Sequence, residues 1–155
     1  MYVISTSLSL VFNTALQVDE APVELVMDQY RMTSEQYLRV TLRSKRAFKG
    51  FLLRAESEGS NHTGSWYIPY LEDTSYLSES HYLHCSGGAQ SAVTHSGRTA
   101  TMFVISFQWK PPAHFHGLIV FRATVVVNYR LFWVDVTAAK VQVGDLDKTP
   151  RKFFR

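Results

Sequence analysis

Residues 48–55 read Phe-Lys-Gly-Phe-Leu-Leu-Arg-Ala. Aromatic and aliphatic side chains dominate this stretch and it contains no proline, so its pattern predicts a β-strand. Phe51, Leu53 and Ala55 would share one face, because successive side chains of a strand point to opposite sides. Gly50 lies between two phenylalanines, and a glycine inside a strand is typical of a place where another backbone or ring comes close. The stretch carries no catalytic group and indicates the core of a β domain.

Alternation of apolar and polar residues predicts strands on both sides of this stretch. Residues 36–43 alternate cleanly, with Leu38, Val40 and Leu42 on one face. Residues 101–109 also alternate, and the side chains expected on the buried face there are Phe103, Ile105, Phe107 and Trp109. Further strands are expected at 23–27, 65–68, 82–85, 92–95, 117–127 and 131–138. The connections between them include residues 30–34, a charged turn at 44–46 and a tight turn at 128–130.

These segments amount to about seven to nine strands with turn signals at short intervals and no convincing helix. An all-β fold follows, and an antiparallel β-sandwich is the natural solution, with a barrel as the alternative. The domain is expected over residues 22–143. Residues 1–21 are expected to be a leader or a poorly ordered segment, and residues 144–155 a basic tail or linker.

Size and charge exclude several classes of protein. The chain has 155 residues, of which 46% are hydrophobic, enough for one domain with a sizeable core. Its net charge of +3 comes from Lys148, Arg151, Lys152 and Arg155, since the rest of the chain has twelve basic and thirteen acidic residues. A basic cluster on the folded domain is therefore not expected, which argues against nucleic-acid binding. No stretch approaches the about 20 apolar residues of a transmembrane segment.

The candidate residues for a metal or catalytic site are histidines. The two clusters are His81-x-x-His84-Cys85 and His114-x-His116. Metal sites usually need three or four converging ligands, so no metal and no cofactor are predicted. His95 could act as a base only beside a nucleophile and an orienting acid, and a hydrogen bond to the backbone is the favoured interpretation. The sequence therefore predicts a protein that is not an enzyme.

Surface recognition is expected in the loops. The polar loop 56–64 contains Asn61-His62-Thr63, which is an acceptor triplet for N-glycosylation. Trp66 borders this loop and is the tryptophan predicted to be at the surface. The other residues predicted to serve surface recognition are His114 and His116, which follow a Pro-Pro turn.

The other two tryptophans and the single cysteine have different expected roles. Trp109 and Trp133 lie in well-patterned strands and are expected to pack in the core. Cys85 is the only cysteine and can form no disulfide within the chain.

The order of these features resembles the Reeler (reelin) domain family. That family is recognised by a Phe-x-Gly-Phe strand followed by an apolar run and Arg-Ala, which is the opening stretch here. The other matching segments are Tyr37-Leu38-Arg39-Val40-Thr41-Leu42, Gly64-Ser65-Trp66, Cys85, Val93-Thr94-His95, Phe107-Gln108-Trp109-Lys110-Pro111, Phe121-Arg122-Ala123-Thr124-Val125-Val126 and Phe132-Trp133-Val134-Asp135-Val136. No single segment is very specific, but the ordered set covers roughly residues 22–138.

This resemblance implies an immunoglobulin-like β-sandwich that works in an extracellular setting. Similar domains occur in reelin, F-spondin, secreted insect defence proteins and ferric-chelate reductase-like membrane proteins. We therefore expect a non-enzymatic module that binds a protein, matrix or glycan ligand. Two alternatives are an ectodomain fragment of a ferric-chelate reductase-like membrane protein and a secreted innate-defence protein that recognises microbial surfaces.

One feature of the family has no counterpart in this chain. Reeler domains normally have an N-terminal cysteine that pairs with the cysteine aligned here with Cys85. The resemblance therefore leaves two alternatives open, which are a partial or alternatively started chain and a chain with a free Cys85.

Overall fold

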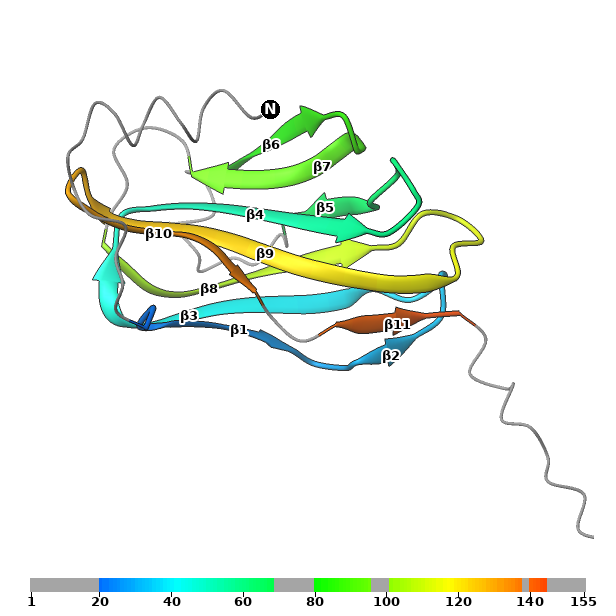
Figure 1. The fold of residues 1–155 in the computed structure, drawn as a ribbon, viewed down its shortest axis with the longest axis horizontal. Coiled ribbons are helices and arrows are strands. Elements are labelled where there is room, and N and C mark those ends of the chain that lie inside the picture. Colours follow the sequence, from blue (N-terminus) through cyan, green and yellow to red (C-terminus); the bar gives the residue numbers. More distant parts are fainter. Residues whose placement is uncertain (1–19, 69–79, 96–100, 138–139, 145–155) are drawn as a thin grey trace, which may run out of the picture.

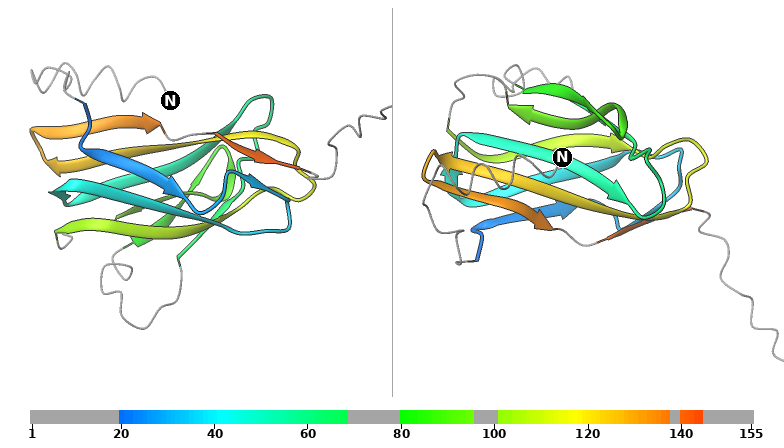
Figure 2. Two further views of the ribbon diagram at one scale, coloured as in Figure 1. Left: turned by 90° about the horizontal axis from the view of Figure 1, so that it is seen from below. Right: turned by 45° about the horizontal axis from the view of Figure 1, so that its top comes forward.

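The computed structural model describes residues 20–68, 80–95, 101–137 and 140–144. This part of the chain forms eleven β-strands in two sheets, and it contains no helix (Figures 1 and 2). The predicted all-β sandwich is confirmed, with more strands than the seven to nine expected. No helix in the described ranges is long and apolar enough to cross a membrane.

The first sheet, sheet A, has four antiparallel strands. Their order across the sheet is β1 (Val23–Met27), β3 (Leu38–Phe48), β8 (Met102–Lys110) and β5 (Ser65–Tyr67). The three predicted strands at 23–27, 36–43 and 101–109 thus become neighbours, although about 60 residues separate β3 from β8 in the sequence.

The second sheet, sheet B, has seven strands. Their order is β2 (Arg31–Met32), β11 (Val141–Val143), β9 (Gly117–Asn128), β4 (Gly50–Ser57), β7 (Gly88–His95) and β6 (Ser80–Cys85), and β10 (Leu131–Thr137) also pairs with β9. All these pairings are antiparallel except that of β2 with β11 (Figure 1). The described strands run from Val23 to Val143.

The core fills the space between the inner faces of the two sheets. Phe51, Leu53 and Ala55 of β4 all point into it, as the alternation of the opening stretch predicted. Phe51 packs on Phe107 of sheet A, with ring centroids 5.5 Å apart. The largest fully buried side chains include Trp66, Trp109, Phe48, Phe107 and Phe121. They stabilise the fold most, because they remove the largest apolar surface from water.

Residues 48–55 form a corner between the two sheets. Phe48 is the last residue of β3 in sheet A, Lys49 is a bend, and Gly50 begins β4 in sheet B. The prediction of one continuous strand over residues 48–55 is therefore wrong in its continuity, because Phe48 belongs to β3 and only residues from Gly50 on belong to β4. A period-2 pattern cannot reveal such a corner, because Phe48 is buried on the inner side of its own sheet and continues the apolar run.

The charged turn predicted at residues 44–46 is also wrong, because β3 continues through it. The pairing of β3 with β8 shifts in register between Arg43 and Phe48, as in a β-bulge. The Ser44 hydroxyl bonds to the backbone of Arg46 within this irregular stretch. The same shift places Met102 opposite Phe48, so Met102 is buried and Phe103, predicted to face the core, is 54% exposed.

Two short strands, β2 and β11, were not predicted from the sequence. Residues 30–34 were expected to be only a connection, but Arg31–Met32 forms β2 and pairs with β11. β11 itself was not predicted. Each strand has two or three residues, which is too few for a period to be recognised, and their pairing joins segments about 110 residues apart.

Gly50 lies against the imidazole of His95. A Cβ atom added to Gly50 would lie 2.8 Å from Cε1 and 3.0 Å from Nε2 of that ring. The ring is held in place because the Phe51 amide donates a 3.1 Å hydrogen bond to His95 Nδ1. The predicted close approach of a ring to Gly50 is confirmed, and so is the predicted hydrogen bond of His95 to the backbone.

We expect the substitution Gly50→Ala to lower the free energy of unfolding by about 1–3 kcal/mol, because the added methyl displaces the His95 ring. His95→Ala should cost about 1–3 kcal/mol by leaving the Phe51 amide without its acceptor. In the double variant the two losses should not add, because the clash disappears with the ring. Urea unfolding of the four proteins measures this coupling. Strictly additive losses would show that the ring contact is not what excludes a side chain at residue 50.

Candidate functional site

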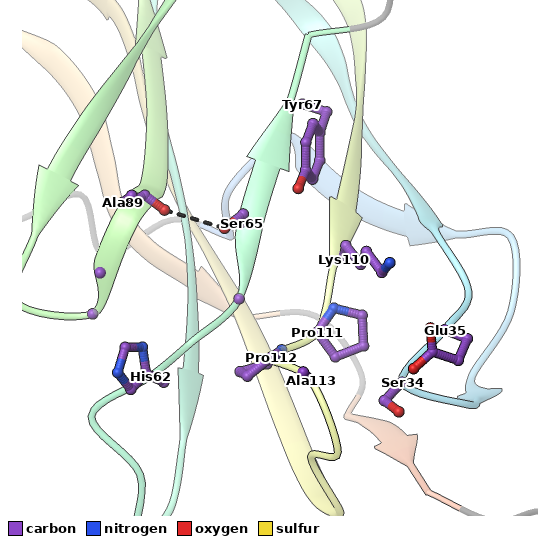
Figure 3. A pocket seen from close by; sticks show the side chains of 13 residues that line it. Ser34, Glu35, His62, Ser65, Tyr67, Ala89, Lys110, Pro111, Pro112 and Ala113 are labelled. Atoms are coloured by element: carbon purple, nitrogen blue, oxygen red, sulfur yellow. Dashed lines mark hydrogen bonds between the residues drawn. The ribbon is translucent and has the colours of Figure 1, made fainter.

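An open cavity of about 430 Å³ lies at one end of the sandwich, where several connections meet (Figure 3). We call it the loop-end pocket. Its lining residues come from the β2–β3 connection, the β4–β5 loop with β5, the β6–β7 turn, and the end of β8 with the connection that follows it. They include Glu35, His62, Tyr67, Lys110, Pro111 and Pro112. A cavity of this volume is within the usual range for small-molecule sites.

Hydrogen bonds fix the loops that form this pocket. Trp109 Nε1 donates to the carbonyl of Thr63 (3.0 Å), and the Thr63 amide donates to the carbonyl of Gly87 (3.3 Å). The Ser65 hydroxyl donates to the carbonyl of Ala89 (3.2 Å; Figure 3). The β4–β5 loop is thereby tied both to the core and to the β6–β7 turn, so one wall of the pocket is held rigid.

Gly64 allows this loop to lie on the core. Its φ of +78° is in the left-handed region, which favours glycine. A Cβ at this position would lie 2.3 Å from the Lys110 carbonyl oxygen and 2.7 Å from the Trp109 ring. Only a residue without a side chain fits between the backbone of β8 and the indole.

Two tyrosines and a lysine form the side of the pocket that continues onto the outer face of sheet A. The Tyr37 and Tyr67 rings meet edge to face, with centroids 5.4 Å apart. The Lys110 ammonium lies 5.3 Å from the centroid of the Tyr37 ring, which is a cation–π arrangement. Tyr67 and Lys110 lie on paired strands, so the sheet itself positions both side chains.

The loop-end pocket contains two oppositely charged side chains, Lys110 and Glu35. The ion pairs found among the described residues lie on the outer face of sheet B, where Arg54 binds Glu56 and Asp135, and Arg122 binds Glu56. None of these ion pairs includes Lys110 or Glu35, although both line the loop-end pocket. The pocket therefore presents one cation and one anion that are not joined to each other.

Trp66, predicted to be at the surface, is fully buried. In the antiparallel pairing of β5 with β8 it lies opposite Trp109, so both indoles point into the core. The Phe121 ring meets both of them edge to face, with centroid distances of 5.7 Å to Trp66 and 5.0 Å to Trp109. A role for Trp66 in surface recognition is therefore wrong. The predicted burial of Trp109 and Trp133 is confirmed.

His114 and His116 are exposed, but neither lines the loop-end pocket. The stretch that contains them is not extended, because His114 lies in a turn with φ +58°. The ring of His116 lies against Gly144, where an added Cβ would be 2.8 Å from Nδ1. The two imidazoles are thus not arranged as a pair on one strand face, and their role in recognition stays a prediction.

The other predicted residues gather in a second groove of about 490 Å³, between the outer face of β4 and the β6–β7 hairpin. Asn61 and Cys85 both line it and are both exposed. His84 is held by the hairpin turn, because its Nδ1 accepts a hydrogen bond from the Gln90 amide (3.1 Å). Among the described residues, no three metal-ligating side chains gather. Glycosylation of Asn61 stays a prediction.

A row of exposed basic side chains follows β3. It consists of Arg39, Arg43, Lys45 and Arg46. Acidic residues lie beside this row, because Glu24 of β1 is opposite Arg43 and Asp28 Oδ1 accepts a hydrogen bond from the Arg39 amide. The absence of nucleic-acid binding remains a prediction.

Comparisons with known proteins agree with this architecture. The family model described as "Reeler domain" matches residues 9–149. This chain belongs to the Reeler domain family. The Reeler structure titled "The crystal structure of Reelin-N domain of F-spondin" superposes with a TM-score of 0.64 and 21% identity, over 92% of this chain and 99% of that one. Likeness at this level of identity concerns the fold.

Two curated relatives share this Reeler sequence more closely. "Putative defense protein 1" from Antheraea mylitta is 29% identical over 132 residues, which cover 82% of this chain and 74% of that protein. "Putative ferric-chelate reductase 1 homolog" from Drosophila melanogaster is 31% identical over 121 residues, which cover 74% of this chain and 18% of that protein. The second match therefore concerns a small part of a much longer protein.

Sequence reasoning missed the main residues of the loop-end pocket in this Reeler domain, Glu35, Tyr67 and Lys110. A signal for two of them was present. If Trp66 and Trp109 both face inward on paired strands, their neighbours Tyr67 and Lys110 must both face outward. Glu35 had no such signal, because it lies in a connection outside any periodic segment.

Proposed function

We propose that this Reeler domain is a non-enzymatic recognition module that works in an extracellular setting and binds its ligand in the loop-end pocket. The observation that carries this proposal is the position of Tyr67 and Lys110, which two paired strands hold at the rim of a cavity with rigid loops. Loops on a rigid β-sandwich are a common location for binding sites. The extracellular setting is supported by the family resemblance.

The environment of two histidines, His95 and His84, also supports a binding role over a catalytic one. The Nδ1 atoms of His95 and His84 accept hydrogen bonds from the Phe51 and Gln90 amides. A general base needs a nitrogen directed at a nucleophile or a substrate. These two imidazoles instead stabilise the strands and the hairpin turn beside them.

Two more specific functions are compatible with this proposal. The relatives named as defence proteins match most of this chain and favour recognition of a foreign surface. The ferric-chelate reductase homolog favours a role as one extracellular part of a membrane protein, whose redox chemistry would belong to its other parts. The defence function has the stronger support, because its relatives are matched over a larger share of their own length.

The proposal predicts that the domain binds to cell surfaces through the loop-end pocket. The fluorescently tagged chain would be incubated with Gram-negative bacteria, Gram-positive bacteria and cultured animal cells, and bound protein measured by flow cytometry. We expect the variant Tyr67→Ala/Lys110→Ala to lose at least about tenfold in apparent affinity, because a few aromatic and charged side chains usually supply most of the binding energy of a site. Binding to bacteria but not to animal cells would favour the defence function.

The matched control for the lost charge is Lys45→Ala, which removes a lysine from β3 outside the pocket. It should bind as the wild type does. Urea unfolding must show that both variants remain folded. Equal binding by the pocket variant and the wild type would contradict the proposal.

A further inference from the structure

The loop-end pocket combines two opposite charges with partly apolar walls. Lys110 extends from the end of β8 toward the β2–β3 connection, which carries Ser34 and Glu35 (Figure 3). No ion pair joins the ammonium to the Glu35 carboxylate or to another described residue. Pro111, Pro112 and Ala113 supply apolar surface beside them.

This combination favours a ligand that carries both charges. An anion would be attracted by Lys110 but repelled by Glu35, and a cation would meet the reverse. A neutral ligand would remove water from both charged groups without supplying a counter-charge to either. A ligand with a separated negative and positive group can pair with both at once.

We propose that the loop-end pocket binds a small zwitterionic group, with its phosphate or carboxylate at Lys110 and its ammonium at Glu35. This inference rests on the proposed function, because it names the class of ligand for the same pocket. Phosphate and carboxylate oxygens accept charge-assisted hydrogen bonds from a lysine ammonium. A substituted ammonium suits the other end, since Glu35 supplies the opposite charge.

The cavity of about 430 Å³ has room for a small zwitterion such as phosphocholine, phosphoethanolamine or an amino acid. The cavity is open and Glu35 is exposed, so water screens the charge pairs in part. Binding of a single group should therefore be weak, with a Kd on the order of a millimolar. Repeated copies of the group on one surface would strengthen it.

The test is a titration of the ¹⁵N-labelled chain with phosphocholine, followed by NMR. We expect amide shifts at Glu35, Tyr67 and Lys110. Choline, inorganic phosphate and methyl glucoside serve as the cationic, anionic and neutral probes, and each should bind at least about threefold more weakly than phosphocholine. Lys110→Gln and Glu35→Gln should each weaken phosphocholine binding by about threefold to fivefold.

Lys45→Gln and Glu24→Gln are matched controls, because they remove the same charges from exposed positions outside the pocket. Equal binding of inorganic phosphate and phosphocholine, or unchanged binding by Glu35→Gln, would overturn the inference. So would the absence of shifts at the pocket up to high phosphocholine concentration. Binding of phosphatidylcholine vesicles through the same residues would identify a lipid headgroup as the source, and binding of free phosphocholine alone would identify a soluble one.

The cell-binding assay tests the recognition module separately from the phosphocholine titration, which tests the zwitterionic ligand. If bacteria or animal cells bind the domain through Tyr67 and Lys110 while phosphocholine does not, the zwitterion is wrong and the recognition module stands. If neither cells nor probes depend on these residues, both fail.

Discussion

Replacing Trp66 with alanine is expected to lower the free energy of unfolding by about 3–5 kcal/mol, which is typical of a large side chain removed from a core. The indole is fully buried and packs against Phe121, which also contacts Trp109. Its removal leaves a cavity between the two sheets that neighbouring side chains can fill only in part. Urea unfolding followed by far-UV circular dichroism measures the loss.

Trp66→Phe separates two contributions to stability, which are the packing of the ring and the hydrogen bonding of its Nε1 atom. Trp66 Nε1 is buried without a hydrogen-bond partner in the described structure, whereas Trp109 Nε1 donates to Thr63. Trp66→Phe should therefore cost less than Trp109→Phe, which also loses a hydrogen bond of about 1 kcal/mol. A nearly neutral Trp66→Ala substitution would contradict the burial of this residue and restore a surface role.

Replacing Gly64 with alanine should cost at least about 3 kcal/mol. The new side chain must adopt a left-handed backbone conformation, which costs roughly 1–2 kcal/mol for a residue with a Cβ atom. It must also displace the Lys110 carbonyl or the Trp109 ring, which lie 2.3 and 2.7 Å from the position of its Cβ. Neither obstacle is the free end of a flexible chain, so the β4–β5 loop must move instead.

Gly59→Ala is a well-matched control within the same loop. Its φ of +77° is almost identical to that of Gly64, but nothing lies within 4 Å of the position of its Cβ. It should therefore lose only the conformational part, roughly 1–2 kcal/mol. The difference between the two variants measures the steric part, and equal losses would show that Gly64 does not pack against Trp109.

Strands with regular alternation were predictable from the sequence. Leu38, Val40 and Leu42 face the core as their spacing indicates. The errors occur where one residue breaks the period. The register shift after Arg43 extends β3 through a segment that looks like a turn, and the bend at Lys49 hides inside an apolar run. Local pattern cannot locate such irregularities, because the partner strand determines them.

The misplaced tryptophan has a related cause. β5 has only three residues, so Trp66 has a single neighbour on each side and no period. What decides its burial is its position opposite Trp109 on a strand about 40 residues away. Proximity to a polar loop was therefore a poor guide to exposure.

The loop-end pocket could not be predicted because four separate segments build it. Its fixed geometry depends on hydrogen bonds between residues far apart in the sequence, such as Trp109 with Thr63. Asn61 and Cys85 were recognised from their residue types alone, yet they line a different groove. The sequence shows which chemical group each residue carries, but it does not show which other residues lie beside it in the fold.

The most direct test of the loop-end pocket as the recognition site uses bulky maleimide labels in the cell-binding assay. Ser34→Cys in a Cys85→Ser background places the label in the pocket, and the native Cys85 places it in the second groove. We predict that the label at residue 34 abolishes cell binding, and that the label at Cys85 leaves it unchanged. Binding that survives the first label, or that only the second label blocks, would contradict the account.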